Sequence, residues 1–471
     1  MIKSIEIFIE GVGVFFFIYL LLYMTYLFIS VLVGAWQLYK KDKMIQVSNQ
    51  LKHKYYFPIS ILVPAYNEEV TIVDSIKSLL KLDYNLYEII IVDDGSKDNT
   101  LKVLLEEFSF VKVDRPIRRS LKCKQQKAIY ETKIGNINLT LISKENGGKG
   151  DSLNMGINAS RFPYFVCIDA DSMLQIDSLE KIMQPVLGDE SIVAVGGMIR
   201  VAQCAEMENG IVNNYKLPNN PIISMQAVEY ERSFLASRIL MDQFNGNLII
   251  SGAFGLFKKD VVIACGGYDS STLGEDMELV LKLHVFCRNN NRDYSICYEP
   301  DAICWSQVPT SLQDLIKQRR RWYLGLFQCM TRYYRVFGNL RFGLVSYISY
   351  MYYLFFELLS PIIEVLGIST IILSWCLGIL NIKFMIEFLL LYSLYGAVLT
   401  ITAFFQKIYT QNLKINFWNI IKVIFICILE NVFFRYVLSF VRVTAFFGYK
   451  KNKNTWGSIK RTKYSNHGKL L

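Results

Sequence analysis

The stretch from Val12 to Trp36 constrains the fold more than any other feature of this chain. It contains no charged residue and exceeds the about 20 residues that a helix needs to cross a bilayer. It is too long for the apolar core of a signal peptide, so we expect a transmembrane helix. Lys40, Lys41 and Lys43 follow it. Because positive residues stay on the cytosolic side, we predict an outside N-terminus and a cytosolic segment after the helix.

Composition agrees with a chain that lies partly in the lipid bilayer. Hydrophobic residues make up 52%, charged residues only 20%, and the mean hydropathy is +0.27. This apolar content exceeds what a soluble domain needs for its core. The net charge of +10 favours anionic headgroups and a phosphorylated substrate as partners, not nucleic acid. The cysteines form no CxxC pair and only three histidines occur, so a structural zinc site is not expected.

Composition also divides the chain into parts. In chain order we expect an N-terminal transmembrane helix (1–40), a cytosolic α/β domain (41–312), amphipathic interfacial helices (313–343), C-terminal transmembrane helices (344–449) and a basic cytosolic tail (450–471). Four apolar segments make up the C-terminal membrane region: 344–360, 361–380, 384–406 and 416–447. The first two meet at Ser360-Pro361, which leaves room only for a tight hairpin or for an interfacial helix that leads into one span.

Short apolar runs alternate with helical periodicity in the soluble part. Ile59–Val63, Glu88–Val92 and Phe162–Ile168 have the continuous apolar character of buried parallel strands, and Val70–Leu80 has helical spacing. This alternation predicts a doubly wound α/β sheet whose strand ends carry the ligand groups. Val111–Leu139 is basic and irregular, and we expect an exposed insertion there.

Acidic pairs follow two of these expected strands. Asp93-Asp94 follows one strand, and Asp169 and Asp171 flank a single residue after another. Two carboxylates at the latter spacing suit Mg²⁺ or Mn²⁺ bridging a diphosphate. Each pair alone could be only a helix cap or a turn. Two such ends on one sheet favour a site for a nucleotide-sugar and a metal ion.

Three further segments carry chemistry. Lys149 lies among three glycines, which suits a phosphate, although such loops are often plain turns. Glu275-Asp276 precedes a helical run, where a carboxylate is either a general base or a helix cap. The segment 318–322 combines an amide, guanidinium groups for phosphate oxygens and an indole face for a sugar ring. That segment can also be a basic interfacial helix, and the two roles are compatible.

Several of these motifs occur in a known order. They are Pro64-Ala65-Tyr66-Asn67-Glu68, Asp93-Asp94, Asp169-Ala170-Asp171, Gly274-Glu275-Asp276 and Gln-x-x-Arg-Trp at 318–322. This set resembles the processive membrane glycosyltransferases of family 2, the synthases of cellulose, hyaluronan, chitin, poly-N-acetylglucosamine and mixed-linkage β-glucan. The resemblance covers roughly residues 55–330 and implies a GT-A type, Rossmann-like domain between transmembrane helices.

The resemblance also implies a role for each matched residue. Asp276 would be the catalytic base, with Glu275 beside it, and Asp169 and Asp171 would hold the metal ion. The donor nucleotide-sugar would contact Ala65, Tyr66, Glu68, Asp93, Asp94, Asp169, Gln318 and Arg321, and the acceptor would contact Trp322. The glycine-flanked Lys149, which is not part of the matched motifs, is expected to contact the donor as well. The segment 456–460 is similar to a gating segment and contributes Trp456 and Lys460, although Ser458 replaces a threonine in it. Gly274 stands where cellulose synthases usually have threonine.

We therefore expect a multi-pass cell-membrane enzyme that transfers sugar from a UDP-sugar, with inversion, to a growing β-linked polysaccharide and translocates that polysaccharide across the membrane. UDP-glucose and a β-glucan product are favoured, and a UDP-N-acetylglucosamine polymerase of the poly-N-acetylglucosamine or hyaluronan type is the alternative. A non-processive polyprenyl-phosphate sugar transferase would need neither 318–322 nor a gating segment. A transporter with a nucleotide-sensing domain would need more polar residues in its spans. Any second-messenger control is expected to need separate regulatory or export subunits.

Overall fold

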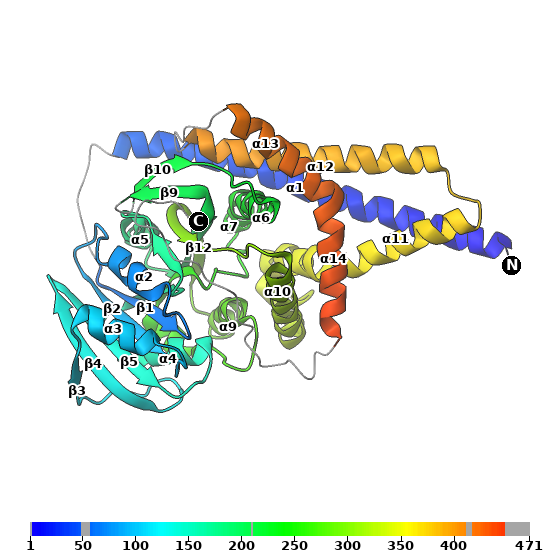
Figure 1. The fold of residues 1–471 in the computed structure, drawn as a ribbon. Helices are drawn as coiled ribbons and strands as arrows, with labels where there is room; N and C mark the ends of the chain where they lie inside the picture. Colours follow the sequence, from blue (N-terminus) through cyan, green and yellow to red (C-terminus); the bar gives the residue numbers. More distant parts are fainter. Residues whose placement is uncertain (1, 49–56, 209–210, 411–416, 448–471) are drawn as a thin grey trace.

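The computed structural model describes residues 2–48, 57–208, 211–410 and 417–447. The long helices α1 (Ile2–Ser48) and α12 (Ile382–Thr410) lie side by side over part of their length, and the α/β domain lies against one end of this layer (Figure 1). Three helical stretches are long and apolar enough to cross a membrane: Ile7–Lys41, Met385–Phe405 and Phe417–Phe446. The chain is therefore a membrane protein.

The α/β domain is built on a ten-stranded mixed sheet with the order β3-β4-β5-β2-β1-β6-β11-β8-β12-β7. Its centre is parallel and consists of β5 (Ile137–Lys144), β2 (Tyr87–Asp93), β1 (Ile59–Ala65) and β6 (Tyr164–Ile168). The antiparallel β11 (Phe254–Lys258) joins β6 to the remaining strands, which are β8 (Ile192–Val201), β12 (Ser295–Ser306) and β7 (Ser172–Leu174). The predicted parallel strands are present, and antiparallel strands at both ends of this parallel centre make the sheet mixed.

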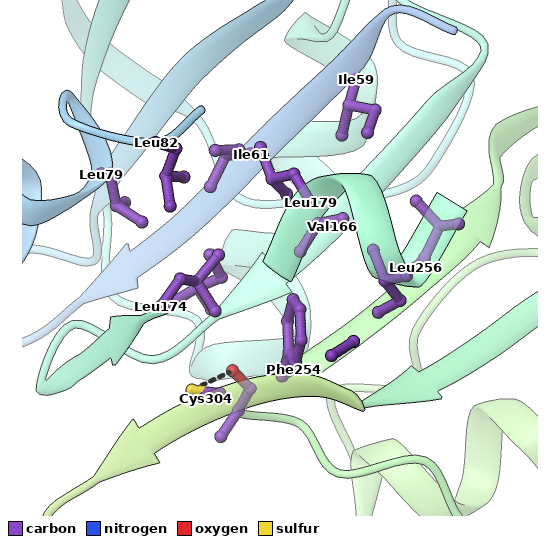
Figure 2. Packing of buried hydrophobic residues seen from close by; sticks show 14 of the residues in the cluster. Ile59, Ile61, Leu79, Leu82, Val166, Leu174, Leu179, Phe254, Leu256 and Cys304 are labelled. Carbon is purple, nitrogen blue, oxygen red and sulfur yellow. Dashed lines mark hydrogen bonds between the residues drawn. The ribbon is translucent and has the colours of Figure 1, made fainter. Parts of the chain in front are cut away.

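Helices cover both faces of this sheet. Ile61 and Val166 pack with Leu79 of α2 (Ile72–Leu79) and Leu179 of α5 (Ser178–Gly188) in one buried cluster (Figure 2). Residues of opposite parity, such as Leu62, pack on the other face with α4 (Lys149–Ala159), α8 (Lys259–Ala264) and α9 (Glu275–Asn289). Burial on both faces explains why the strands are continuously apolar in sequence. One more helix, α3 (Thr100–Phe108), follows β2.

The expectation of an irregular insertion at 111–139 is wrong. β3 (Val111–Val113) and β4 (Gln126–Ile134) add antiparallel strands to the sheet, and β5 already begins at Ile137. Most residues of β4 are half-buried or exposed, because only the short β3 lies beyond it. A strand near the edge therefore lacks the apolar run by which the central strands are recognised.

Between the sheet and the membrane helices lies a helical segment made of α6 (Pro221–Arg232), the π-helical Ser233–Ser237 and α7 (Arg238–Asp242) (Figure 1). A small hairpin of β9 (Ala205–Glu208) and β10 (Ile211–Tyr215) precedes it. After β12, the chain enters α10 (Leu312–Arg332), which begins where the Ser311 hydroxyl accepts a hydrogen bond from the Asp314 N–H.

The segments expected at 344–360 and 361–380 do not form a hairpin. Val345–Leu358, largely π-helical, continues into α11 (Ser360–Cys376) with a bend of 44°. The pair is either one broken span or a re-entrant segment, so the tight hairpin is wrong. The last membrane element consists of α13 (Phe417–Leu429), the π-helical Glu430–Phe434 and α14 (Arg435–Val443).

Candidate active site

A cavity of about 940 Å³ opens at the carboxyl ends of β1 and β6. Its volume lies in the range of small-molecule sites. The cavity also extends between membrane helices, where Tyr23 of α1 and Arg435 of α14 line it. Among the residues singled out from the sequence, those that line it are Ala65, Tyr66, Glu68, Asp94, Lys149, Asp169, Asp171, Glu275, Asp276, Gln318, Arg321 and Trp322.

Asp169 and Asp171 lie in the turn between β6 and β7. The Asp169 side chain is 33% exposed and forms an ion pair with Lys149, whereas Asp171 is buried and accepts a hydrogen bond from the Ser172 hydroxyl at 3.4 Å. Within the described part of the chain, no three or more His, Cys, Asp or Glu side chains are grouped to hold a metal ion. The two carboxylates fit a hard divalent cation only when diphosphate oxygens and water complete its ligand set.

Lys149 reaches this turn from the start of α4. Gly148 precedes it with φ 90°, a left-handed conformation that favours glycine. The Lys149 Nζ contacts Asp169 and lies 3.8 Å from a carboxylate oxygen of Glu275. Burial alone would lower the pKa of Lys149, but these two carboxylates outweigh it and raise the pKa. A Cβ at position 252 would lie 2.9 Å from Lys149 Nζ, so Gly252 leaves the space that the ammonium occupies.

Glu275 and Asp276 form the first turn of α9. The Asp276 carboxylate accepts hydrogen bonds from the Met277 N–H at 2.8 Å and the Gly252 N–H at 3.3 Å. Burial raises the pKa of Glu275 to about 7, against the opposing charge of Lys149 and with the like charge of Asp276. Two backbone donors therefore orient the Asp276 carboxylate, which lines the cavity.

A close backbone contact brings α10 to this acid pair. A Cβ on Gly325 would lie 2.9 Å from the Gly274 Cα, so Gly325 excludes a side chain, and a Cβ on Gly274 would lie a tight 3.1 Å from the Gly325 backbone. The Gln328 amide oxygen accepts hydrogen bonds from the Leu273 N–H at 2.8 Å and the Thr272 hydroxyl at 3.0 Å. The glycine at 274, unusual beside the threonine of cellulose synthases, follows from this packing. As a result, the segment 318–322 borders the same cavity as Asp276.

The acids after β2 have other surroundings. The Asp94 carboxylate forms an ion pair with the buried Lys144 and accepts the N–H groups of Gly147 at 3.0 Å and Gly148 at 2.8 Å. Lys144 also contacts Asp151 at 2.7 Å. Asp94 thus supports the glycine loop before Lys149, and because it also lines the cavity its contact with the donor stays a prediction.

Asp93 lies deeper than Asp94 and does not line the cavity. Its carboxylate accepts hydrogen bonds from the Ser96 N–H at 3.1 Å and the Ser143 hydroxyl at 3.3 Å. Contact of Asp93 with the donor stays a prediction. The gating residues Trp456 and Lys460 lie outside the described residues.

Sequence reasoning missed several residues of this site. Lys144 ends an apolar strand as its only basic residue, which is a weak signal for a buried cation. Arg319 and its partner Glu229 are separated by 90 positions, and nothing local in the sequence pairs them. Gly252 and Gly325 carry no signal in a single sequence, because their role is to leave space for a neighbour.

Comparisons with known proteins identify the class of this site. The profile "Glycosyl transferase family 2" matches residues 60–264, and "Glycosyl transferase family group 2" matches 164–405. The poly-beta-1,6-N-acetyl-D-glucosamine synthase of Staphylococcus aureus (strain COL) is 30% identical over 364 residues, which are 76% of this chain and 74% of that protein. The enzyme of the same name from Staphylococcus epidermidis is 29% identical over 324 residues, 67% of this chain and 66% of that one.

Among solved structures, the mannosyltransferase PcManGT from Pyrobaculum calidifontis, in complex with GDP-Man and Mn²⁺, has a TM-score of 0.50 and 16% identity, covering 88% of this chain and 98% of that one. The chain belongs to glycosyltransferase family 2, and its α/β domain has the GT-A type fold. It is thus a glycosyltransferase and not a transporter with a nucleotide-sensing domain.

Proposed function

We propose that this enzyme polymerises N-acetylglucosamine from UDP-N-acetylglucosamine into a β-linked chain and passes that chain into the membrane region. Two of the proteins to which this chain is similar are named poly-beta-1,6-N-acetyl-D-glucosamine synthases. They favour N-acetylglucosamine over glucose, the sugar that the sequence alone favoured. The observation that carries the proposal is the cavity, which connects Asp276 and Trp322 with side chains of the membrane helices.

In the reaction, Asp276 accepts the proton of the acceptor hydroxyl. The acceptor oxygen then forms a bond to the anomeric carbon from the face opposite the diphosphate, and the bond from that carbon to the phosphate oxygen breaks. A single displacement converts an α-linked donor into a β-linked product. Lys149 and Arg321 border the cavity and offset the negative charge that develops on the leaving UDP.

A divalent cation, Mg²⁺ or Mn²⁺, would be held by Asp169 and Asp171 together with the donor diphosphate. Two lines of support are the hard carboxylate oxygens of the β6–β7 turn and the Mn²⁺ in the mannosyltransferase of similar fold. When bound, such a cation supplies positive charge beside the leaving diphosphate. Asp169 pairs with Lys149 in the described structure, so it would have to exchange that partner when the donor binds.

The membrane part of the cavity suits a polyhydroxylated chain. Glu364 accepts hydrogen bonds from Arg435 at 2.7 Å and from the Ser360 hydroxyl at 3.1 Å, and all three residues line the cavity. Ionisable residues at membrane depth face a cavity or a partner, and here they do both.

For the topology we retain a cytosolic α/β domain, an outside N-terminus and a cytosolic tail. A cytosolic tail requires that Val345–Cys376 be re-entrant, because a full crossing there would place the tail outside. A cysteine introduced at Ser465 and treated with an impermeant reagent in intact cells tests this topology. Labelling from outside would contradict it.

The test of function uses the purified full-length enzyme with radiolabelled UDP-N-acetylglucosamine and, in parallel, UDP-glucose. We expect polymer only from the former, sensitive to a glycanase specific for β-linked N-acetylglucosamine. Asp276→Asn should reduce turnover about 10²–10⁴-fold with UDP affinity retained, because the amide keeps the shape and cannot accept a proton. Polymer from UDP-glucose, or a lipid-linked monosaccharide as the only product, would refute the proposal.

A further inference from the structure

Arg319 is the second residue of the segment 318–322, and no role has been given to it so far. It is only 4% exposed although it is charged. Its two terminal nitrogens donate hydrogen bonds to the two carboxylate oxygens of Glu229 at 2.7 and 2.6 Å. Glu229 lies on α6, so this fork connects the cavity-lining helix α10 with the helical segment between the sheet and the membrane helices. A bidentate pair of this kind fixes the plane of the guanidinium group.

The plane fixed in this way lies over Trp322. The guanidinium carbon of Arg319 is 4.8 Å from the centroid of the indole ring. The Tyr230 ring, next to Glu229 on α6, lies 6.5 Å from the same indole with an interplanar angle of 33°. Trp322 nevertheless stays 40% exposed and lines the cavity. The indole is therefore oriented by contacts from α6 and α10 and keeps surface for a ligand.

The ion pair is charged at neutral pH. Burial alone would raise the pKa of Glu229, but the guanidinium groups of Arg319, Arg442 and Arg232 together outweigh burial and hold the pKa below its usual value. The same carboxylate raises the pKa of Arg319 against the effect of burial. The charge on the guanidinium favours its contact with the indole face.

We propose that Arg319 is a positioning residue for the acceptor: held by Glu229, it fixes the orientation in which the Trp322 indole receives the terminal sugar of the growing chain. The inference rests on the proposed function, since it assumes that Trp322 contacts the acceptor. It assigns to Arg319 an effect on elongation that is transmitted through Trp322 and that leaves donor binding unchanged.

The test compares Arg319→Lys and Glu229→Gln with the wild-type enzyme. Lysine keeps the charge but loses the planar fork, and glutamine keeps the shape but loses the charge. With oligosaccharides cut from the wild-type product as acceptors, we expect the apparent acceptor KM to rise roughly 2- to 30-fold, the range that one cation–π contact supplies. Product chains should shorten, while UDP affinity and the donor KM stay within twofold. Arg320→Lys is the matched control, because Arg320 is exposed and does not line the cavity.

A double-mutant cycle separates positioning from simple structural support. If Arg319 acts through Trp322, Arg319→Lys has no further effect on the acceptor KM in a Trp322→Ala background. Additive effects in that background, equal losses of UDP and acceptor affinity, or wild-type elongation by Arg319→Lys would each overturn the inference. A wild-type enzyme that makes no polymer would instead refute the proposed function, so the two failures are distinguishable.

Discussion

The ends of β2 and β6 each carry two aspartates, and the two ends have different surroundings. After β2, Asp94 has a buried ammonium and two backbone N–H groups as partners, and Asp93 has a backbone and a hydroxyl donor. After β6, the ion-pair partner of Asp169 is Lys149, and a third of the Asp169 side chain is exposed.

The two lysines explain the difference. Lys144 extends from a central strand and is 0% exposed, so its charge is enclosed with Asp94 and Asp151. Lys149 begins a helix beside an open cavity, and its ammonium contacts Asp169 across that space. An enclosed ion pair stabilises a loop, whereas a pair at the edge of a cavity can exchange partners when a diphosphate arrives. Similar acidic motifs therefore serve support at one strand end and, in our proposal, ligand binding at the other.

The largest expected effect comes from exchanging the two lysines for methionine, one at a time. Lys144→Met leaves Asp94 and Asp151 without their buried cation and should cost about 3–5 kcal/mol of folding free energy. Lys149→Met removes a charge beside the cavity and should weaken UDP binding with little change in Tm. Thermal unfolding and UDP titration of both variants provide the measurement. If the two variants lost equal stability, the comparison would fail.

Asp169→Ala and Asp171→Ala examine the β6 end. Each removes a proposed cation ligand and should reduce turnover by about 10²–10³-fold, the scale of one oriented electrostatic group, while the protein stays folded. UDP release measured across a Mg²⁺ or Mn²⁺ titration should also lose its metal dependence. Full activity of either variant in chelator would show that these carboxylates hold no cation.

Glu275→Gln should change how the stability of the protein depends on pH, because Glu275 lies beside Lys149 and the acids of the cavity. Because the pKa of Glu275 is raised from 4.5 to about 7, the folded state holds a proton that the unfolded state has released. The wild-type protein therefore loses stability as pH rises from about 4.5 through 7. The glutamine variant should have a higher Tm than wild type above pH 7 and a similar Tm near pH 4.5, measured in chelator without donor. If the Tm difference between the variant and the wild type stayed the same from pH 4.5 to above pH 7, the raised pKa of Glu275 would be contradicted.

The smallest effect is expected from Asp93→Asn at the β2 end. An amide oxygen can still accept one of the two hydrogen bonds, so the cost should be about 0.5–1.5 kcal/mol. UDP affinity should change little, because Asp93 does not line the cavity. A large loss of UDP affinity with normal Tm would instead support the direct donor contact that the sequence predicts.

Local patterns in the sequence were sufficient for much of the fold. β1, β2 and β6 are recognisable because strands buried on both faces need apolar residues at every position. The sequence singled out Asp169 and Asp171 because two carboxylates that flank a single residue at a strand end suit a diphosphate-bound cation. The structure places both at the cavity, and their role as cation ligands stays a prediction. The order of these motifs along the chain was enough to identify the family. β4 was missed because a half-buried strand next to the edge of the sheet has no such continuous apolar pattern.

Only the tertiary structure decided which charges are enclosed and which are open. It pairs Lys144 with Asp94 over 50 positions and Arg319 with Glu229 over 90. It also brings Gly325 against Gly274. Finally, it joins Val345–Leu358 to α11 by a bend, where a hairpin was one expectation. The physical reason is that burial and pairing depend on neighbours distant in sequence. A lysine or an aspartate has the same local pattern whether it ends up enclosed in a core or beside a cavity.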